Sequence, residues 1–488
     1  MEIKPHIKEN HERLSKYNTL FHDYVRRNPE SLRASGYGLL ELNDPLFKLQ
    51  PWPTFIGPKI KAEIIEANLK VLDLLKCIPQ RVFSNDPGAI SKYYGVSREL
   101  ANYFIYGVTD EHLDNLLARG DFIITPTGLK CLEFNVNTNL GGMSLPLWES
   151  LYQATPVISE FLKQHRVIIR NRNLYHFMFE HLAKAAVKFY RGCDKINIAL
   201  VMGVDFNDPR RASQERYLNT VFNNVLQSGF SRLDGQVSVC TYAQLKIVGD
   251  NVFYNGKRVH VIVEWCHGFV PHDILELFNE RQILICNGAI AWILSTKLNL
   301  ALLSENKDSG WFSAEEKETI EKYIPWTRKV TDSETTYKGE TVQLKDFTLA
   351  NREKLVLKPL IGAGGKDIHV GPHTPEKEWQ DVVEAAMHPN DWQDIHFDEN
   401  LSEEQWYEIV KKAAEVKNWL VQEYIEPSTY IYQAGENGCG EHHAVWGFFM
   451  FGNTYSGGWV RAIPTDSKSG IINCHQGAKV SVVFEVEE

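Results

Sequence analysis

The stretch RGDFIITPTGLKCLEFNVNTNLGG, residues 119 to 142, alternates polar and apolar residues on both sides of a central Thr-Pro-Thr-Gly segment. A period of two is typical of half-buried β-strands, and proline and glycine are typical of the turn between them. We therefore expect a β-hairpin with one apolar face and one polar face. The apolar set is Phe122, Ile124, Leu132, Phe134 and Val136, and the polar set is Arg119, Asp121, Glu133 and Asn135.

The length of the turn decides which polar side chains meet. A three-residue, bulged loop with Gly128 in the left-handed conformation would place Asp121 opposite Glu133 and Arg119 opposite Asn135. A strict two-residue turn would shift the pairing by one residue and put the pairs on opposite faces. We expect the bulged loop, because it gathers the four polar groups on one face.

The polar face of this hairpin has two interpretations. Carboxylates that face each other across a hairpin repel unless a cation or a proton lies between them. With the amide oxygen of Asn135, the carboxylates of Asp121 and Glu133 are hard ligands of the kind that Mg²⁺ takes alongside phosphate oxygens. The alternative is an amphipathic hairpin whose charged face only meets water, which is common in antiparallel sheets. The hairpin alone leaves both interpretations open.

The composition is that of a globular protein large enough for two or three domains, at 488 residues. The 52 basic and 62 acidic residues give a formal charge of -10, which argues against a nucleic-acid partner. The eight cysteines form no Cys-x-x-Cys pair, a pattern that favours reduced thiols in a cytoplasmic protein. The N-terminus is polar and charged, so we expect no signal peptide.

The most apolar segment, residues 283 to 304, is not expected to span a membrane. Asn287, Lys297 and Asn299 interrupt it, and Asn287-Gly288 predicts a turn between a buried strand and a helix.

The chain divides into three predicted units of an α/β protein. Residues 1–165 read as helices followed by the hairpin. Residues 166–287 alternate strands and helices, which indicates an open, largely parallel sheet. Residues 288–488 carry a lysine–glycine segment, a long helical section near 376–416, a buried strand and a final stretch rich in strand formers.

The segment KLVLKPLIGAGGKDIHV, residues 354 to 370, predicts a strand carrying Lys358, a glycine loop and a second strand. Gly362, Gly364 and Gly365 would let backbone N–H groups close on phosphate oxygens, and Lys358 would add a positive charge. No Gly-Lys-Ser/Thr follows, so this is not a Walker loop, and the dinucleotide Gly-x-Gly-x-x-Gly pattern is absent too. A plain hairpin is the alternative.

Two later segments have purely structural explanations when each is taken alone, and they indicate a function only together with the other motifs. WLVQEYIEP, residues 419 to 427, is a buried strand whose exit could present backbone N–H and C=O groups to an adenine edge. Arg461 follows a Gly-Gly pair, and taken alone it is better explained as a structural ion-pair partner.

Together these segments resemble the ATP-grasp superfamily, and specifically its circularly permuted branch, the glutathionylspermidine-synthetase-like ligases. In that branch the metal-binding carboxylates precede the phosphate-binding lysine and glycine loop, as they do here by over two hundred residues. The resemblance covers roughly residues 100 to 488. It implies an ATP-grasp core divided between 1–165, which also holds an N-terminal helical region, and 288–488. A preATP-grasp-like α/β domain, 166–287, would lie between them.

The resemblance also implies a role for each matching residue. Asp121, Glu133 and Asn135 would bind two Mg²⁺ ions, and Arg119 would lie near the transferring phosphoryl group, with Arg461 as a second catalytic residue. ATP would be bound by two lysines, the glycine loop and the strand exit, which correspond to Lys297, Lys358, Gly362, Gly364, Gly365, Gln422, Glu423, Tyr424 and Ile425.

The activity that the resemblance implies is ATP-dependent ligation of a small-molecule carboxylate to an amine through an acylphosphate. The expected partners are those two substrates, with a homodimer as the candidate assembly and neither nucleic acid nor membrane. A phosphotransferase and a non-catalytic nucleotide-binding protein are the alternatives. No amidase domain and no glutathione or polyamine signature is recognisable, so the substrates are not identified.

Overall fold

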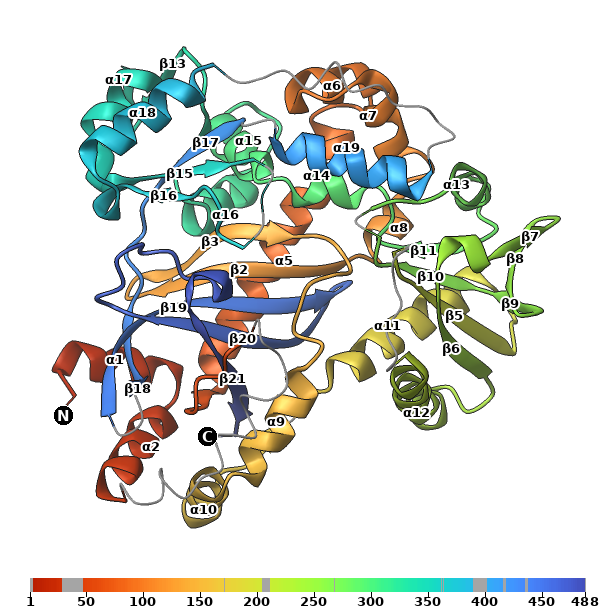
Figure 1. Ribbon diagram of the computed structural model, residues 1–488, viewed down its shortest axis with the longest axis horizontal. Helices are drawn as coiled ribbons and strands as arrows, with labels where there is room; N and C mark the ends of the chain where they lie inside the picture. Colours follow the sequence, from red (N-terminus) through yellow and green to blue (C-terminus); the bar gives the residue numbers. More distant parts are fainter. Residues whose placement is uncertain are drawn as a thin grey trace.

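The computed structural model describes residues 3–28, 47–170, 172–203, 211–266, 268–360, 362, 364–388, 402–415, 418–434 and 438–487. Part of the predicted helical section near 376–416 lies outside these ranges, as does Ala363 of the glycine loop. The described chain is a mixed α/β protein, as predicted, with several sheets surrounded by helices (Figure 1).

The largest sheet lies at the centre of the molecule and joins segments from both ends of the chain (Figure 1). Only β1 and β21 pair in parallel, and the other pairs are antiparallel. The strand order is β1 (Thr54–Ile56), β21 (Lys479–Val486), β20 (Thr454–Pro464), β19 (Gly438–Phe451), β2 (Leu117–Thr125) and β3 (Gly128–Asn135). Two further strands, β18 (Thr429–Ala434) and β4 (Ile169–Arg170), pair with β19 and β21.

Strands β2 and β3 form the predicted hairpin with the predicted register. Asp121 pairs with Glu133, and Arg119 pairs with Asn135. The predicted loop is wrong, however, because Thr125 pairs with Gly128 and only two residues lie between the strands. The register is restored within the sheet by a β-bulge, since Phe122 pairs with Cys131 and the next pair is Asp121 with Glu133.

The bulge changes the direction of one side chain. The extra residue is Leu132, which was expected on the apolar core face. Cys131 takes that place and is fully buried, whereas Leu132 lines a cavity on the polar face. The hairpin therefore presents apolar as well as charged groups to the cavity.

The segment between the hairpin and residue 287 forms the predicted parallel sheet, with strand order β11, β10, β5, β6. The neighbouring helices α11 and α12 contact each other, and α12 also packs on β6. A three-stranded antiparallel excursion, β7 to β9, interrupts the alternation. The bounds are α11 (Leu174–Phe189), β5 (Lys195–Val201), α12 (Arg211–Gly229), β6 (Asp234–Cys240), β7 (Lys246–Val248), β8 (Asn251–Tyr254), β9 (Lys257–Val259), β10 (Val261–Glu264), α13 (His272–Asn279) and β11 (Leu284–Cys286).

A smaller antiparallel sheet forms a lobe above the hairpin (Figure 1), with strand order β12, β17, β15, β16. Its apolar side chains, among them Trp379 and Trp419, form a hydrophobic cluster separate from the main core. The lobe comprises β12 (Thr327–Lys329), β13 (Glu334–Tyr337), β14 (Glu340–Gln343), α17 (Leu344–Ala350), β15 (Leu355–Pro359), β16 (His369–Val370), α18 (Glu376–Ala386) and β17 (Trp419–Glu423).

The remaining helices surround these sheets, and several begin at clear sequence signals. Pro58 starts the long helix behind the central sheet, and Ser313 and Glu316 form a capping box. These helices are α1 (Pro5–Leu14), α2 (Lys16–Arg27), α5 (Pro58–Arg81), α6 (Pro87–Tyr94), α7 (Arg98–Ile105), α8 (Asp110–Leu113), α9 (Leu145–Ala154), α10 (Pro156–Gln164), α14 (Ala291–Ser295), α15 (Leu298–Asn306), α16 (Ala314–Tyr323) and α19 (Glu403–Glu415).

The apolar segment 283–304 folds as predicted, with β11 followed by a turn at Gly288 and then by α14 and α15. Within the described ranges, no helix combines the length and the apolar character needed to cross a membrane. All eight cysteines are described, and each is a free thiol.

Candidate functional site

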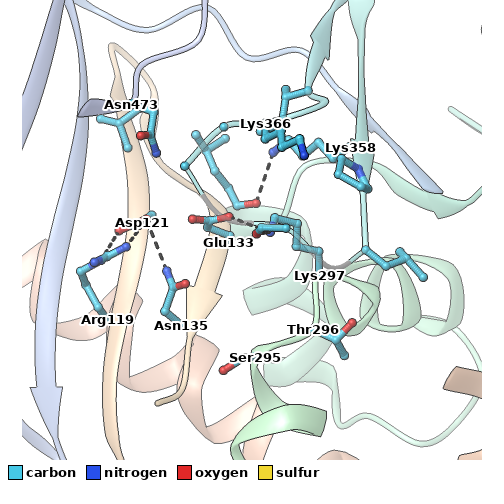
Figure 2. Close-up of a pocket in the computed structure, with 18 of the residues that line it drawn as sticks. Arg119, Asp121, Glu133, Asn135, Ser295, Thr296, Lys297, Lys358, Lys366 and Asn473 are labelled. Carbon is cyan, nitrogen blue, oxygen red and sulfur yellow. Dashed lines mark hydrogen bonds and ion pairs between the residues drawn. The ribbon is translucent and has the colours of Figure 1, made fainter. Parts of the chain in front are cut away.

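A cavity of about 770 Å³ lies where the polar face of the hairpin meets the smaller sheet. Each of the fourteen residues singled out from the sequence as site candidates lines it. They come from the hairpin, the residue just before α15, β15, the glycine loop, β17 with the residues after it, and β20, and several of these segments are far apart in the chain. The labelled side chains from the hairpin, from the start of α15 and from β15 point toward one another (Figure 2).

Asp121 is the buried centre of the acidic end, with 1% of its surface exposed. Arg119 donates to both of its carboxylate oxygens, from Nε at 2.8 Å and from Nη2 at 2.9 Å. Arg461 Nη2 lies 2.9 Å from Oδ2, and Asn135 Nδ2 donates to the same oxygen at 3.4 Å. The third guanidinium nitrogen of Arg119, Nη1, donates to the carbonyl of Leu140. Asp121 thus fixes two arginines, Arg119 and Arg461, that are far apart in the chain.

Glu133 is less tightly held than Asp121. Lys297 Nζ lies 3.3 Å from its Oε2 and also donates to the carbonyl of Gly362 at 3.3 Å. Burial alone would raise the pKa of Glu133, but the positive charges of Lys297, Lys358 and Arg461 outweigh it and hold the pKa below its ordinary value. Glu133 is therefore an anion at neutral pH.

Lys358 lies on β15 and is almost completely buried. It donates to Gln422 Oε1 at 2.6 Å and to the carbonyl of Leu132 at 3.4 Å. Gln422 is itself held by Thr327, since its Nε2 donates to Oγ1 at 3.1 Å. Burial lowers the pKa of Lys358 to about 8, and the charge of Glu133 offsets only part of that effect. Gln422 consequently acts through its side chain, by orienting Lys358.

Two glycines of the loop, Gly364 and Gly365, pack against residues 471–476. Gly364 has φ +70°, and a Cβ there would lie 2.9 Å from Nδ1 of His475. Gly365 has φ +74°, and a Cβ there would lie 2.8 Å from Ile471. Only glycine meets both the backbone conformation and the close approach. Gly362 also lines the cavity.

The exit of β17 offers fewer free backbone donors than the sequence suggests. The N–H of Glu423 donates to the carbonyl of Trp326 at 2.8 Å, and the N–H of Tyr424 donates to the carbonyl of Lys354 at 2.7 Å. Ile425 is the next residue, and its N–H has no hydrogen-bond partner in the described part of the chain. Ile425 is therefore the residue of this exit that can donate to a ligand.

The charges at this end of the cavity are unbalanced. The four cationic side chains described above face two carboxylates, which leaves an excess positive charge of two. Such an excess favours a polyanionic ligand.

The donors present fit magnesium only together with such a ligand. Over the ranges that the structure describes, no three His, Cys, Asp or Glu side chains gather into a metal-binding group. Asp121, Glu133 and Asn135 supply two carboxylates and an amide, and Mg²⁺ commonly completes a set of this kind with phosphate oxygens. Glu133 is the more accessible ligand, because the oxygens of Asp121 already accept bonds from two arginines.

Several cavity residues were missed by sequence reasoning. They are Thr138, Glu264, Trp292 and Lys366, together with Phe104 from α7. Lys366 follows the glycine pair directly, so its position next to a phosphate-binding motif was an available signal. The other four come from two helices, a loop and one strand end with no local motif, and only the folded topology brings them together.

The fold can be compared with that of a solved structure. The chain is an α/β protein with a glutathione synthetase-like fold. A solved structure named a glutathione synthetase-like effector from Globodera pallida, in its apo form, superposes with a TM-score of 0.52 over 96% of this chain and 98% of that chain. The two sequences are 11% identical, so this likeness concerns the fold. No protein-family model and no curated protein sequence matches the chain.

Proposed function

We propose that the protein is an ATP-dependent carboxylate–amine ligase of the circularly permuted ATP-grasp type. The enzyme would activate a small-molecule acid as an acylphosphate, join it to an amine and release ADP and phosphate. The observation that carries the proposal is the meeting of the acidic hairpin with the lysine–glycine segment in one cavity. Lys297 Nζ lies 3.3 Å from Glu133, and Lys358 Nζ lies 3.4 Å from the carbonyl of Leu132.

Each part of the cavity has a task in this proposal. Lys297, Lys358 and the glycine loop would hold the phosphates of ATP, and the N–H of Ile425 would donate to the adenine edge. Leu132 would cover the base, since it lines the cavity beside Lys358. Arg119 and Arg461 would stabilise negative charge on the transferring phosphoryl group, which is the main catalytic need of this chemistry.

Two Mg²⁺ ions would be held by Asp121, Glu133 and Asn135 together with phosphate oxygens. When bound, they would neutralise charge on the β- and γ-phosphates. Glu133 is suited to this task because its pKa is held below the ordinary value and it is ionised at neutral pH.

The test is ADP release with a panel of carboxylic acids and amines, with mass spectrometry of the products. We expect an amide product in the wild type and no ATP turnover in Glu133→Gln. Glu111→Gln is a matched control, because Glu111 pairs with Arg281 outside the cavity and its side chain is 24% exposed, against 28% for Glu133. ATP-dependent product formation in Glu133→Gln at the wild-type rate would contradict the assignment.

The same experiment distinguishes the ligase from the two alternative functions. A stable phosphorylated product in place of an amide would indicate a phosphotransferase. The structural neighbour is named an effector, which motivates a non-catalytic function as the other candidate. In that case no acid or amine would stimulate ADP release from any variant.

A further inference from the structure

A buried carboxylate lies where the cavity meets the parallel sheet. Glu264 is the last residue of β10, has 2% of its surface exposed and lines the same cavity as the lysines. The carboxyl ends of parallel strands are where α/β proteins place ligand-binding groups. The proposed phosphate-binding set does not use this residue.

Glu264 has no cationic partner among the described side chains. No Lys, Arg or His in the described ranges forms an ion pair with it, and only backbone N–H groups, those of Cys266 and Gly268, donate to its carboxylate. Burial raises the pKa of Glu264 to about 8, and the charge of Glu403 on α19 adds to that increase. A buried carboxylate without a counter-ion is costly, and a cation bound beside it would remove that cost.

The wall beside Glu264 is apolar. Gly268 packs so closely on Trp292 that a Cβ there would lie 2.5 Å from the indole ring. Trp292 in turn stacks on Phe104, with ring centroids 6.0 Å apart and an interplanar angle of 9°. Val410 of α19 also lines this cavity. A ligand that reaches Glu264 therefore carries an apolar stem, and its charged group can also interact with the aromatic faces.

The chain path between Glu264 and the proposed metal ligands is short enough for one small molecule to reach both. The hydroxyl of Thr138 donates to the backbone carbonyl of Glu264, and Thr138 follows Asn135 by three residues. Three residues of extended chain span at most about 10 Å. One substrate could therefore contact Glu264 at one end and the phosphoryl-transfer site at the other.

We propose that Glu264 binds the ammonium group of a substrate whose apolar stem lies against Trp292 and Phe104 and whose reacting group lies at the phosphates. This inference rests on the proposed ligase function for the identity of the reacting group, but not for the binding of the ammonium. The ammonium belongs either to an ω-amino acid, which would be the acid substrate, or to a diamine, which would be the amine substrate. The ω-amino acid and the diamine both carry the ammonium group that Glu264 would bind.

The binding test uses the full-length protein and four probes in isothermal titration calorimetry at pH 7. The probes are 6-aminohexanoate, 1,6-diaminohexane, and the neutral-ended counterparts hexanoate and 1-hexanol. We expect the two ammonium probes to bind the wild type and Glu264→Gln to lose at least tenfold in affinity. The glutamine keeps an acceptor for the backbone N–H groups of Cys266 and Gly268, so that variant retains the local structure and loses only the ability to ionise when an ammonium binds.

A proton readout separates ligand binding from a structural function. Because the pKa of free Glu264 is about 8, it is largely protonated at pH 7, and a bound ammonium favours the ionised form. We expect release of nearly one proton per probe at pH 7 and almost none at pH 9, measured in buffers of different ionisation enthalpy. The titratable groups that face Glu264 are Glu403 of α19, Tyr103 of α7, Tyr242, Cys266 and Cys286.

The matched control is Glu149→Gln. Glu149 is also buried with a pKa raised to about 8, and it does not line the cavity, so this variant should bind all four probes like the wild type. Equal binding of 1,6-diaminohexane and 1-hexanol, unchanged ammonium binding in Glu264→Gln, or no binding at all would overturn the proposal. ADP release and amide formation then identify the source, with 6-aminohexanoate tested as the acid against a panel of amines and 1,6-diaminohexane tested as the amine against a panel of carboxylic acids. Ammonium binding without any ADP release would contradict the ligase and leave the Glu264 site in place.

Discussion

Replacing Asp121 by asparagine separates the structural function of the acidic hairpin from its proposed catalytic function. In the wild type, Asp121 accepts three charge-assisted bonds from Arg119 and Arg461. Asp121→Asn keeps the size of the side chain but leaves two buried guanidinium groups without their anion. Breaking a buried ion pair by removing one partner costs about 3–5 kcal/mol. The equilibrium ratio of folded to unfolded protein should therefore fall by a factor of roughly 10² to 10³·⁵ relative to the wild type.

The assay is denaturant unfolding of the nucleotide-free protein, followed by intrinsic fluorescence. We expect a clearly lower midpoint for Asp121→Asn and a small change for Glu133→Gln, because Glu133 has one ion-pair contact, at 3.3 Å. Both variants should lose ATP turnover, since each removes a proposed metal ligand. Equal midpoints for Asp121→Asn and the wild type would refute the reasoning, because the two arginines would then not depend on this carboxylate.

Three further predictions concern pH and the glycine loop. The pKa of Glu149 is raised from 4.5 to about 8, so the folded state keeps a proton that the unfolded state loses, and stability should fall as the pH rises from 4.5 to 8. Glu149→Gln should flatten this profile in pH-dependent unfolding, and an unchanged slope would contradict the assignment. Lys358, with a pKa of about 8, loses its charge above that pH, so the affinity for ATP should decrease there, while Lys358→Arg should show a flatter profile in nucleotide titrations. Gly364→Ala should slow turnover about tenfold, because a side chain at φ +70° costs about 1–2 kcal/mol and meets His475, whereas Gly339→Ala, at φ +88° in open space, should leave turnover unchanged.

The pairing of the hairpin could be predicted from sequence because alternation fixes which residues share a face. The β-bulge that produces this pairing could not be predicted from the sequence. The turn has two residues, and the bulge at Leu132 supplies the extra residue within the strand. A bulge depends on how the neighbouring strand packs, and the hairpin sequence holds no information on that packing.

The meeting of the proposed phosphate-binding residues in one cavity was predictable for a different reason. Lysine, glycine and carboxylate motifs keep their chemistry wherever the chain places them, and the resemblance fixed their combination. Glu264 and Trp292 carry no such motif, and their proximity arises because the end of β10 and the start of α14 meet at the cavity. The three domain ranges remain a prediction, although the separate apolar cluster around Trp379 falls within the third range.

The position of β21 has a consequence for synthesis on the ribosome. This strand, which ends at Val486, lies between β1 and β20, and β2 pairs with β19, so the central sheet joins the first and last parts of the chain. The parallel sheet of residues 195–286 needs no later segment for its strand pairing and can form while translation continues. The edge of β2 that pairs with β19 stays without its partner strand until β19 has been synthesised. We therefore expect the nascent chain to depend on chaperones until β21 has been synthesised, and truncations within β21 to accumulate as aggregates rather than as shortened native protein.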